Sequence, residues 1–526
     1  MPVELRALIF VFLSVSLPIM ILMKFAGYYS MKKDFQKWVI VWVVATTLSF
    51  LSYNFWLFLA FMCVFLLFLT REKPILKISL FFVLLPSFPP GFVAIPGFGL
   101  INFVINVSFP LFLSTILLLP LVISNTKKNK ALKVTELFLY SFFALSIIMH
   151  YQESSFVRQG VTILRESSVT GVLRYFVSLT LGMLIPFLAI SRTVKSTKNM
   201  TTIFMAIIFG TFMQTCIGIV ETYKSWHLYN SVSHVLNLDG GIVNYLTRQD
   251  ILRASSALGH PIFLGFIAAI GMGVLIFFHR ETNSKSRRLF WLLMTLFAGG
   301  LIVTLSRGPW VGAVIMVLCF FLTGKSAVKK VSKFGVLGVI IVLVMSAFPV
   351  GQSITNIIPY LNSEPENSAA STITYRERLF EQSLKVIAKN PILGTVNYLQ
   401  DPDMEVMRQG EGIIDMVNSY LGIALEYGLV GLSLYLSIFL FTLIKVRKII
   451  KKLTIYRMDE TSILQGRIIF STMTGMLAIL FTTSSGIFTS YYLWSFLGLA
   501  GAFVNISQQN IYRRFSEVKS AQVSSV

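Results

Sequence analysis

The sequence predicts an all-α, polytopic integral membrane protein with about 14–15 transmembrane helices. Of its 526 residues, 55% are hydrophobic and only 13% are charged, and the mean hydropathy is +0.74. Apolar runs near the length that crosses a bilayer recur along the whole chain. Because the backbone in lipid must satisfy its own hydrogen bonds, these runs should be helices. We therefore expect a single integral membrane domain over residues 1–526.

The apolar runs give the order of the predicted helices. One region, 84–110, contains Pro86, Pro89, Pro90 and Pro96, and it predicts a broken or re-entrant pair of helices. The residues from about Ser507 onward are polar and predict a frayed tail. The predicted membrane helices are 6–23, 38–53, 55–70, 76–95, 103–124, 134–150, 172–190, 201–220, 260–279, 289–305, 309–323, 334–349, 417–444, 466–484 and 487–505.

The formal charge of +22 comes largely from Lys and Arg in short loops between apolar runs. Such loops mark the cytoplasmic side of membrane proteins, so no nucleic-acid partner is expected. The basic loops are 124–133, 191–198, 280–288, 325–333 and 445–457, and the tail 507–526 shares their side. The segments between them then face outward: 151–171, 221–258, the turn at 305–309, and a long loop, 350–416.

The three cysteines, Cys63, Cys216 and Cys319, all lie within apolar runs. Their placement favours small buried apolar side chains over a disulfide framework or a metal site. We expect neither a metal nor a cofactor.

The long outward loop predicts an amphipathic helix. Thr374 and Glu377 have the spacing of a capping box, which predicts that the helix begins there, and Asn390-Pro391 predicts its end. Arg376 and Arg378 would then lie in its first turn. The alternative for both is a solvated helix face with ion pairs to neighbouring glutamates.

A second outward segment is Ser306-Arg307-Gly308-Pro309-Trp310. Pro309 suits the first position of a helix, which places Arg307 beside free backbone N–H groups. A cation at that positive end is unfavourable unless an anion binds there, and the pattern indicates a phosphate-binding corner. The alternative is an arginine that reaches to lipid headgroups.

A third segment opens the next transmembrane helix. Gly428 and Gly431 have a spacing that allows another backbone to approach closely. Glu426 lies inside the apolar run, where an ionisable group is costly and usually functional. Pairing with a neighbouring helix is the structural alternative.

Together these segments resemble the O-antigen ligase and Wzy-type polymerase superfamily. The C-terminal signature is carried by Arg376 with Phe380, by Asn390-Pro391-Ile392-Leu393-Gly394, and by Asn418-x-Tyr420-Leu421 followed by Glu426-x-Gly428-x-x-Gly431. Ser306-Arg307-Gly308 resembles a second motif, and the stretch from Arg253 to Pro261 resembles a third. The resemblance covers residues 253–431.

The resemblance implies glycan transfer at the outer face of the bacterial cytoplasmic membrane. The donor would be an undecaprenyl-diphosphate-linked oligosaccharide, used without metal or nucleotide sugar. Ligases of the family carry a His directly before the Asn of the last motif, and this chain has Val417. That departure favours a polymerase, with a chain-length regulator as a partner by analogy. The alternatives are a ligase with another acceptor, a lipid-linked oligosaccharide flippase, and a scaffold of an export complex.

Site roles follow from the resemblance and from residue chemistry. Arg307 and Arg376 are predicted to hold the diphosphate, and Asp415 or Glu411 to act as the base. For His260 an interfacial or hydrogen-bonded role is the alternative. The predicted substrate-binding residues are Arg378, Arg253, His260, Asn418, Tyr420 and Glu426.

Overall fold

The protein is an all-α polytopic membrane protein, as the sequence predicted. The computed structural model describes residues 1–97, 103–125, 132–152, 157–159, 162–165, 169–240, 246–248, 250–279, 284–324, 368–409, 412–484 and 486–524. Within these residues nine helices are long and apolar enough to cross a membrane, and four shorter apolar helices accompany them. The predicted helix 334–349 and residues 350–367 and 410–411 of the loop 350–416 lie outside the described residues.

The helices of the N-terminal half are α1 (Val3–Gly27), α2 (Lys32–Leu51), α3 (Phe55–Thr70), α4 (Pro74–Leu84), α5 (Phe109–Leu113), α6 (Leu119–Ser124), α7 (Lys133–Gln152), α8 (Val169–Leu179), α9 (Ile185–Thr193), α10 (Thr197–Lys224) and α11 (Asn230–Val235). Those that follow are α12 (Pro261–Leu275), α13 (Ser284–Val303), α14 (Arg307–Leu322), α17 (Ser368–Lys389), α18 (Pro402–Glu405), α19 (Ser419–Ile455), α20 (Glu460–Leu480) and α21 (Ile487–Ser524).

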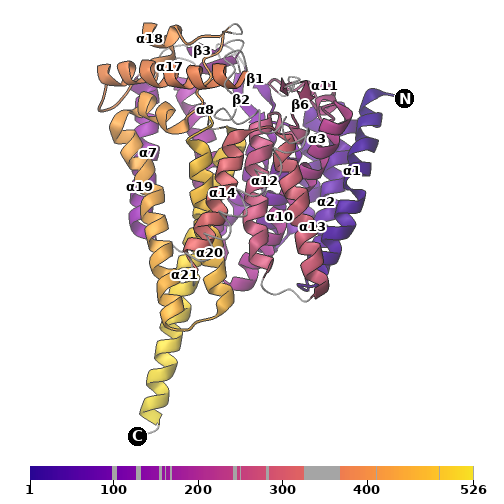
Figure 1. Cartoon of the computed structure of the whole chain (residues 1–526), viewed down its shortest axis with the longest axis vertical. Coiled ribbons are helices and arrows are strands. Elements are labelled where there is room, and N and C mark those ends of the chain that lie inside the picture. The colour runs from indigo at the N-terminus through magenta and orange to yellow at the C-terminus, as the bar shows by residue number, and fades with distance from the viewer. Residues whose placement is uncertain are drawn as a thin grey trace, which may run out of the picture.

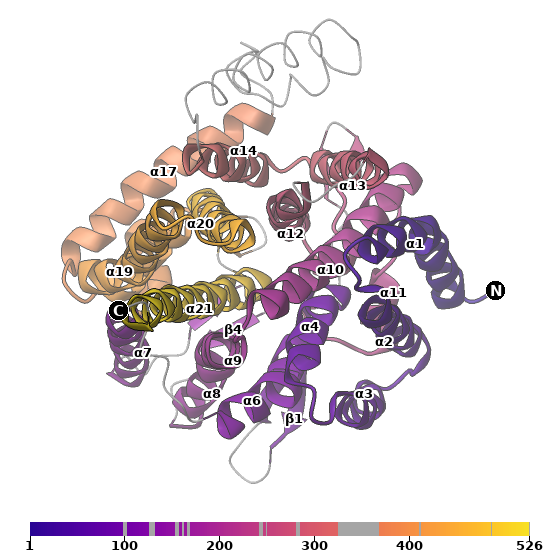
Figure 2. The ribbon, with the colours of Figure 1, turned by 90° about the horizontal axis from the view of Figure 1, so that it is seen from below.

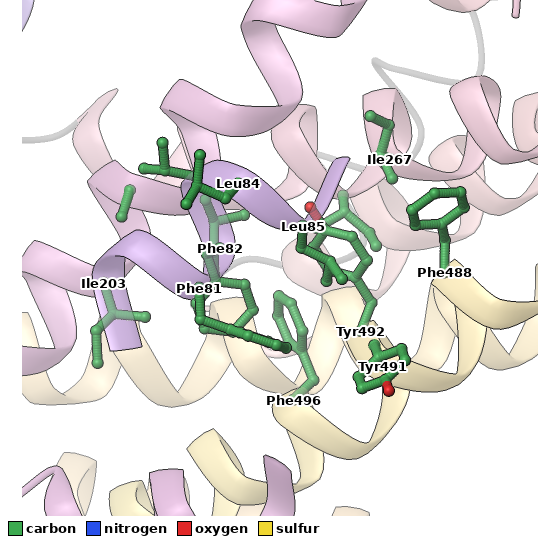
Figure 3. Close-up of a cluster of buried hydrophobic side chains, with 14 of the residues drawn as sticks. Phe81, Phe82, Leu84, Leu85, Ile203, Ile267, Phe488, Tyr491, Tyr492 and Phe496 are labelled. Atoms are coloured by element: carbon green, nitrogen blue, oxygen red, sulfur yellow. The ribbon is translucent and has the colours of Figure 1, made fainter. Parts of the chain in front are cut away.

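Most of the long helices run roughly parallel, and α17 lies across one end of the bundle (Figure 1). Seen along the bundle, α10 is central, and it packs against α1, α4, α12 and α13 (Figure 2). Apolar and aromatic side chains from α4, α10, α12 and α21 meet in the interior, among them Phe82, Ile203, Ile267 and Tyr492 (Figure 3). This packed centre supports the end of the bundle that carries α17.

The region 84–110 is neither a clean pair of spans nor a re-entrant helix pair. Helix α4 ends at Leu84, and the chain forms a hairpin of β1 (Phe92–Pro96) and β2 (Phe103–Ser108) before α5 begins. Prolines remove backbone N–H donors and clash with a preceding turn, so the chain leaves the helix here. Two smaller antiparallel pairs, β3–β4 (Val157–Gln159, Thr162–Arg165) and β5–β6 (Thr247–Arg248, Ile251–Leu252), lie in other connections.

Two predicted helix ends were wrong in the same direction. Helix α19 continues to Ile455, through the stretch predicted as a basic loop, and α21 continues to Ser524, so the tail is helical and not frayed. Lys, Arg, Gln and Glu are good helix formers. A polar sequence therefore ends a membrane span without ending the helix.

Helix α19 is interrupted at Gly428, whose φ of 62° and ψ of −167° are not helical. The break frees the N–H groups of Leu429 and Val430, which donate to the carbonyls of Pro391 (2.9 Å) and Ile392 (3.1 Å). The close backbone approach predicted at Gly428 is therefore made by the loop that follows α17. These hydrogen bonds form a joint between residues 391–392, which follow α17, and residues 428–430 of α19, and the joint fixes α17 to α19 beside Glu426.

Candidate active site

The turn between α13 and α14 is held by two arginines of the β5–β6 connection. The Arg253 guanidinium donates to the carbonyl of Thr304 (3.1 Å) and to the hydroxyl of Ser306 (2.9 Å). Arg248 donates to the carbonyl of Leu305 (2.9 Å). Arg253 was predicted to bind substrate, whereas Arg248 was missed. The sequence did contain a sign of its role. Arg248 is a basic residue in a loop predicted to face outward, whereas basic residues usually gather in the cytoplasmic loops.

Arg307 is the first residue of α14, and Pro309 is the third residue and not the first. The proline still lies in the first turn, where the N–H groups have no partner within the helix. The Arg307 Nε is buried and has no hydrogen-bond partner among the described residues. The arginine thus keeps donors available at the positive end of a helix.

Arg376 lies in the middle of α17 and not in its first turn, because the helix begins at Ser368, ahead of the predicted capping box. Its guanidinium donates to the carbonyl of Thr482 (3.0 Å). A Cβ on Gly308 would lie 2.2 Å from the Thr482 hydroxyl, so the start of α14 packs directly on the same residue. The structure therefore brings Arg307 and Arg376 to one place.

The connection between α20 and α21 contacts the helices that carry Arg307 and Arg376. Sequence analysis missed its role. The carbonyl of Thr483 accepts from both the backbone N–H (3.1 Å) and the hydroxyl (2.7 Å) of Ser419, the first residue of α19. The connection thus contacts α14, α17 and α19. Its signal was a run of small polar residues between two apolar runs, Thr482-Thr483-Ser484-Ser485-Gly486.

The four arginines repel one another. Burial and the charge of Arg376 lower the pKa of Arg248, and burial with the charge of Arg248 lowers the pKa of Arg253 to about 10. The positive charges of Arg248 and Arg376 also repel that of Arg307. Within the described residues, none of the four forms a salt bridge. A cluster of this kind is costly unless an anion binds to it.

Asp415 lies beside this cluster. Its backbone is held to α17 through Tyr375, whose hydroxyl accepts from the Asp415 N–H (3.0 Å) and donates to the Asp415 carbonyl (3.1 Å). Burial raises the pKa of the Asp415 carboxyl, and the charge of Arg376 acts in the opposite direction. Asp415 is thus a carboxylate close to the arginines, in a cavity of about 350 Å³ that Asn418 and Glu426 also line.

The other predicted residues are placed differently. Arg378 is exposed on α17, and Glu411 lies outside the described residues. Asn418 is the N-cap of α19, and its side-chain oxygen accepts from the N–H groups of Tyr420 (3.0 Å) and Leu421 (3.3 Å). The Tyr420 hydroxyl donates to the carbonyl of Leu477 (2.7 Å). The structure therefore gives Asn418 and Tyr420 positioning contacts within the protein.

His260 is the N-cap of α12, and its Nδ1 accepts from the N–H of Ile262 (3.2 Å). That contact needs an unprotonated Nδ1. Burial, and then the charge of Arg253, lower the pKa of His260 from 6.5 to about 4. His260 is therefore a neutral capping residue at neutral pH and connects the arginine cluster to the start of α12.

The depressed pKa of His260 predicts a loss of stability in acid. Below pH 6.5 the unfolded chain takes up a proton at His260 that the folded chain takes up only near pH 4. The free energy of unfolding should therefore fall through this window, by up to about 3 kcal/mol. The His260→Asn variant keeps a capping oxygen without the titration. The Tm in detergent should fall more steeply with acid for the wild type than for His260→Asn, and parallel curves would contradict the assignment.

Two cavities meet at Glu426. The cavity of about 350 Å³ holds Asp415 and Ser484, and a second one of about 540 Å³ lies between α7, α8, α19 and α21. Both are lined by Ile423 and Glu426. The Tyr427 hydroxyl donates to Glu426 Oε1 (3.0 Å), and His150 Nε2 lies 3.8 Å from the same oxygen. Sequence analysis found no signal in His150, because its partner is 276 residues away in the sequence.

Residues 290–436 match the family described as O-antigen ligase. The chain thus contains a segment similar to the O-antigen ligase family. The match runs from α13 to the kinked part of α19, so Arg307, Arg376, Asp415 and Glu426 all lie within the matched segment. No match to a curated protein was found. The resemblance inferred from the motifs is thus confirmed, and the many apolar helices with this segment indicate a multi-pass bacterial inner-membrane protein.

Proposed function

We propose that this protein is a Wzy-type polysaccharide polymerase. It transfers a growing undecaprenyl-diphosphate-linked glycan onto a lipid-linked repeat unit, at the outer face of the cytoplasmic membrane. The observation that carries the proposal is the arginine cluster at one end of the bundle, with Arg307 and Arg376 meeting at Thr482. A lipid diphosphate is the anion that such a cluster fits best in a membrane protein of this family.

The reaction joins an acceptor hydroxyl to the anomeric carbon of the donor sugar. The bond from that carbon to the diphosphate oxygen breaks, and the diphosphate leaves with the electron pair. Guanidinium groups stabilise the charge that develops on this oxygen. The charge of Asp415 acts on Arg376, and Asp415 lines the cavity, where its carboxylate can polarise the acceptor hydroxyl. In this proposal the arginines neutralise the leaving group.

The choice of polymerase over ligase depends on Val417. This side chain packs against the small apolar cluster under α17, which includes Leu379 and Met404, and it cannot accept a proton. The acceptor chemistry therefore differs from that of a ligase with His at this position. The orientation is supported by α13, which ends at the site and so begins, with Arg287 and Arg288, at the opposite end of the bundle (Figure 1).

Purified protein in detergent, given lipid-linked repeat units, tests the proposal. A polymerase yields a ladder of lipid-linked products with increasing numbers of repeats. A single addition to each acceptor would identify a ligase. Movement of the lipid-linked unit across vesicles without any new glycosidic bond would identify a flippase, and either of these two results would overturn the polymerase assignment.

A further inference from the structure

Glu426 and His150 form a titratable pair that neither the arginine cluster nor Asp415 accounts for. His150 is on α7 and Glu426 on α19, and the two helices pack against each other. The His150 side chain is 7% exposed and that of Glu426 is 23% exposed. Both belong to the end of the bundle that carries the arginines, because α7 ends and α19 begins there (Figure 1).

The contacts of His150 decide where its proton lies. Its Nδ1 is 2.9 Å from the carbonyl of Ser146, so this nitrogen must carry a hydrogen and donate it. In a neutral imidazole the Nε2 then has only a lone pair, which faces Glu426 Oε1 at 3.8 Å. A lone pair beside a carboxylate is unfavourable. A proton placed on Nε2 would turn this contact into one between a cation and a carboxylate, so the pair offers a position for one proton.

Neighbouring tyrosines fix this pair in place. The Tyr175 ring stacks on the His150 ring, with centroids 3.6 Å apart and planes 9° apart. Because the Tyr427 hydroxyl donates to Glu426, the Tyr175 hydroxyl, 2.9 Å away, donates to Tyr427. The Tyr427 hydroxyl thus points toward the Glu426 carboxylate, and the Tyr175 hydroxyl supports it from α8. Two titratable groups that face the pair are thus Tyr175 on α8 and Tyr427 on α19.

The cavity beside the pair has the chemistry of a saccharide site. Its volume of about 540 Å³ lies within the range of ligand pockets. Tyr435 and Trp494 provide aromatic surface suited to the C–H faces of sugar rings, and Ser178, Thr489 and Ser490 provide hydroxyls. The neighbouring cavity, which shares Glu426, leads to Ser484, two residues from the carbonyl that binds Arg376.

We propose that the larger cavity binds the acceptor saccharide and that the His150–Glu426 pair receives the proton of its attacking hydroxyl. This inference rests on the proposed transfer reaction. The acceptor oxygen bonds to the anomeric carbon of the donor as its O–H bond breaks, and the proton passes to the pair. The bond from that carbon to the diphosphate oxygen breaks at the same time, and the diphosphate leaves with the electron pair of that bond. Asp415, which faces a cation, keeps its role beside Arg376. The pair later releases its proton to water through the cavity.

The dependence of the transfer rate on pH tests the inference. With lipid-linked repeat units as the probe, kcat of the wild type should rise with pH as the pair loses its proton. The Glu426→Gln variant keeps an acceptor for Tyr427 but cannot take a proton, so we expect kcat to fall about a hundredfold and the rise to disappear. Asp415→Asn should lower kcat and leave the pH of the rise unchanged.

Binding of undecaprenyl diphosphate reports on the arginine cluster, and the Tm of each variant reports on folding. Both should be unchanged in Glu426→Gln. A wild-type pH profile in this variant would overturn the role of the pair, even if Arg376→Ala abolishes transfer. If the wild type itself forms no glycosidic bond with lipid-linked units, the proposed function fails and not the proton assignment alone.

Discussion

Replacing Arg376 with alanine should lower the rate of glycan transfer by at least about a hundredfold. The guanidinium is held by the carbonyl of Thr482 beside the start of α14, where charge on the leaving diphosphate would develop. Arg307→Ala should have an effect of similar size, because the Arg307 Nε, which has no partner among the described residues, lies in the same cluster. Initial rates of transfer in detergent, with the amount of folded protein matched, measure both effects.

A matched control comes from the same helix. Lys385 is an exposed cation on α17 outside the site, and Lys385→Ala should transfer at the wild-type rate. The double variant Arg307→Ala, Arg376→Ala should lose less than the product of the two single losses, since both groups act on one diphosphate. Near-normal transfer by the Arg376→Ala protein would remove this arginine from the mechanism.

The second large effect is expected on stability, at Gly428. Its φ of 62° with a ψ of −167° belongs to a region open essentially to glycine alone. A Cβ there would lie 2.3 Å from the Ile392 carbonyl oxygen. Strain and overpacking should together cost the Gly428→Ala protein about 2–6 kcal/mol of folding free energy. The expected result is a large fall in the Tm in detergent, or loss of monodisperse protein.

Gly422, on the same helix, is the control for this substitution. Among the described residues, a Cβ at Gly422 meets no heavy atom within 4 Å outside its own helix backbone and chain neighbours, and Gly422→Ala should leave the Tm close to that of the wild type. Gly394→Ala should resemble Gly428→Ala, because Gly394 has a φ of 71° and its Cβ would lie 2.4 Å from the Gly428 N. Equal Tm values for the Gly428 and Gly422 variants would show that the joint of α17 and α19 is not rigid.

Membrane class, the approximate positions of the spans and the motif residues could be read from the chain alone. Hydropathy is a local property, and lipid forces each apolar run into a helix whatever its neighbours are. The same holds for Asn418 at the start of α19 and for Asn390-Pro391 at the end of α17, because caps and proline act within one turn. Helix ends within polar sequence, at Ile455 and Ser524, were not readable in this way.

The composition of the site depended on contacts between distant segments. Arg376 meets the start of α14 through Thr482, 106 residues further along the chain, and Glu426 meets His150 across 276 residues. No local pattern records which loop carbonyl will receive a guanidinium, or which helix faces a carboxylate. Those pairings are set when the packed bundle brings the ends of α7, α14, α17 and α19 together, so only the tertiary structure could reveal them.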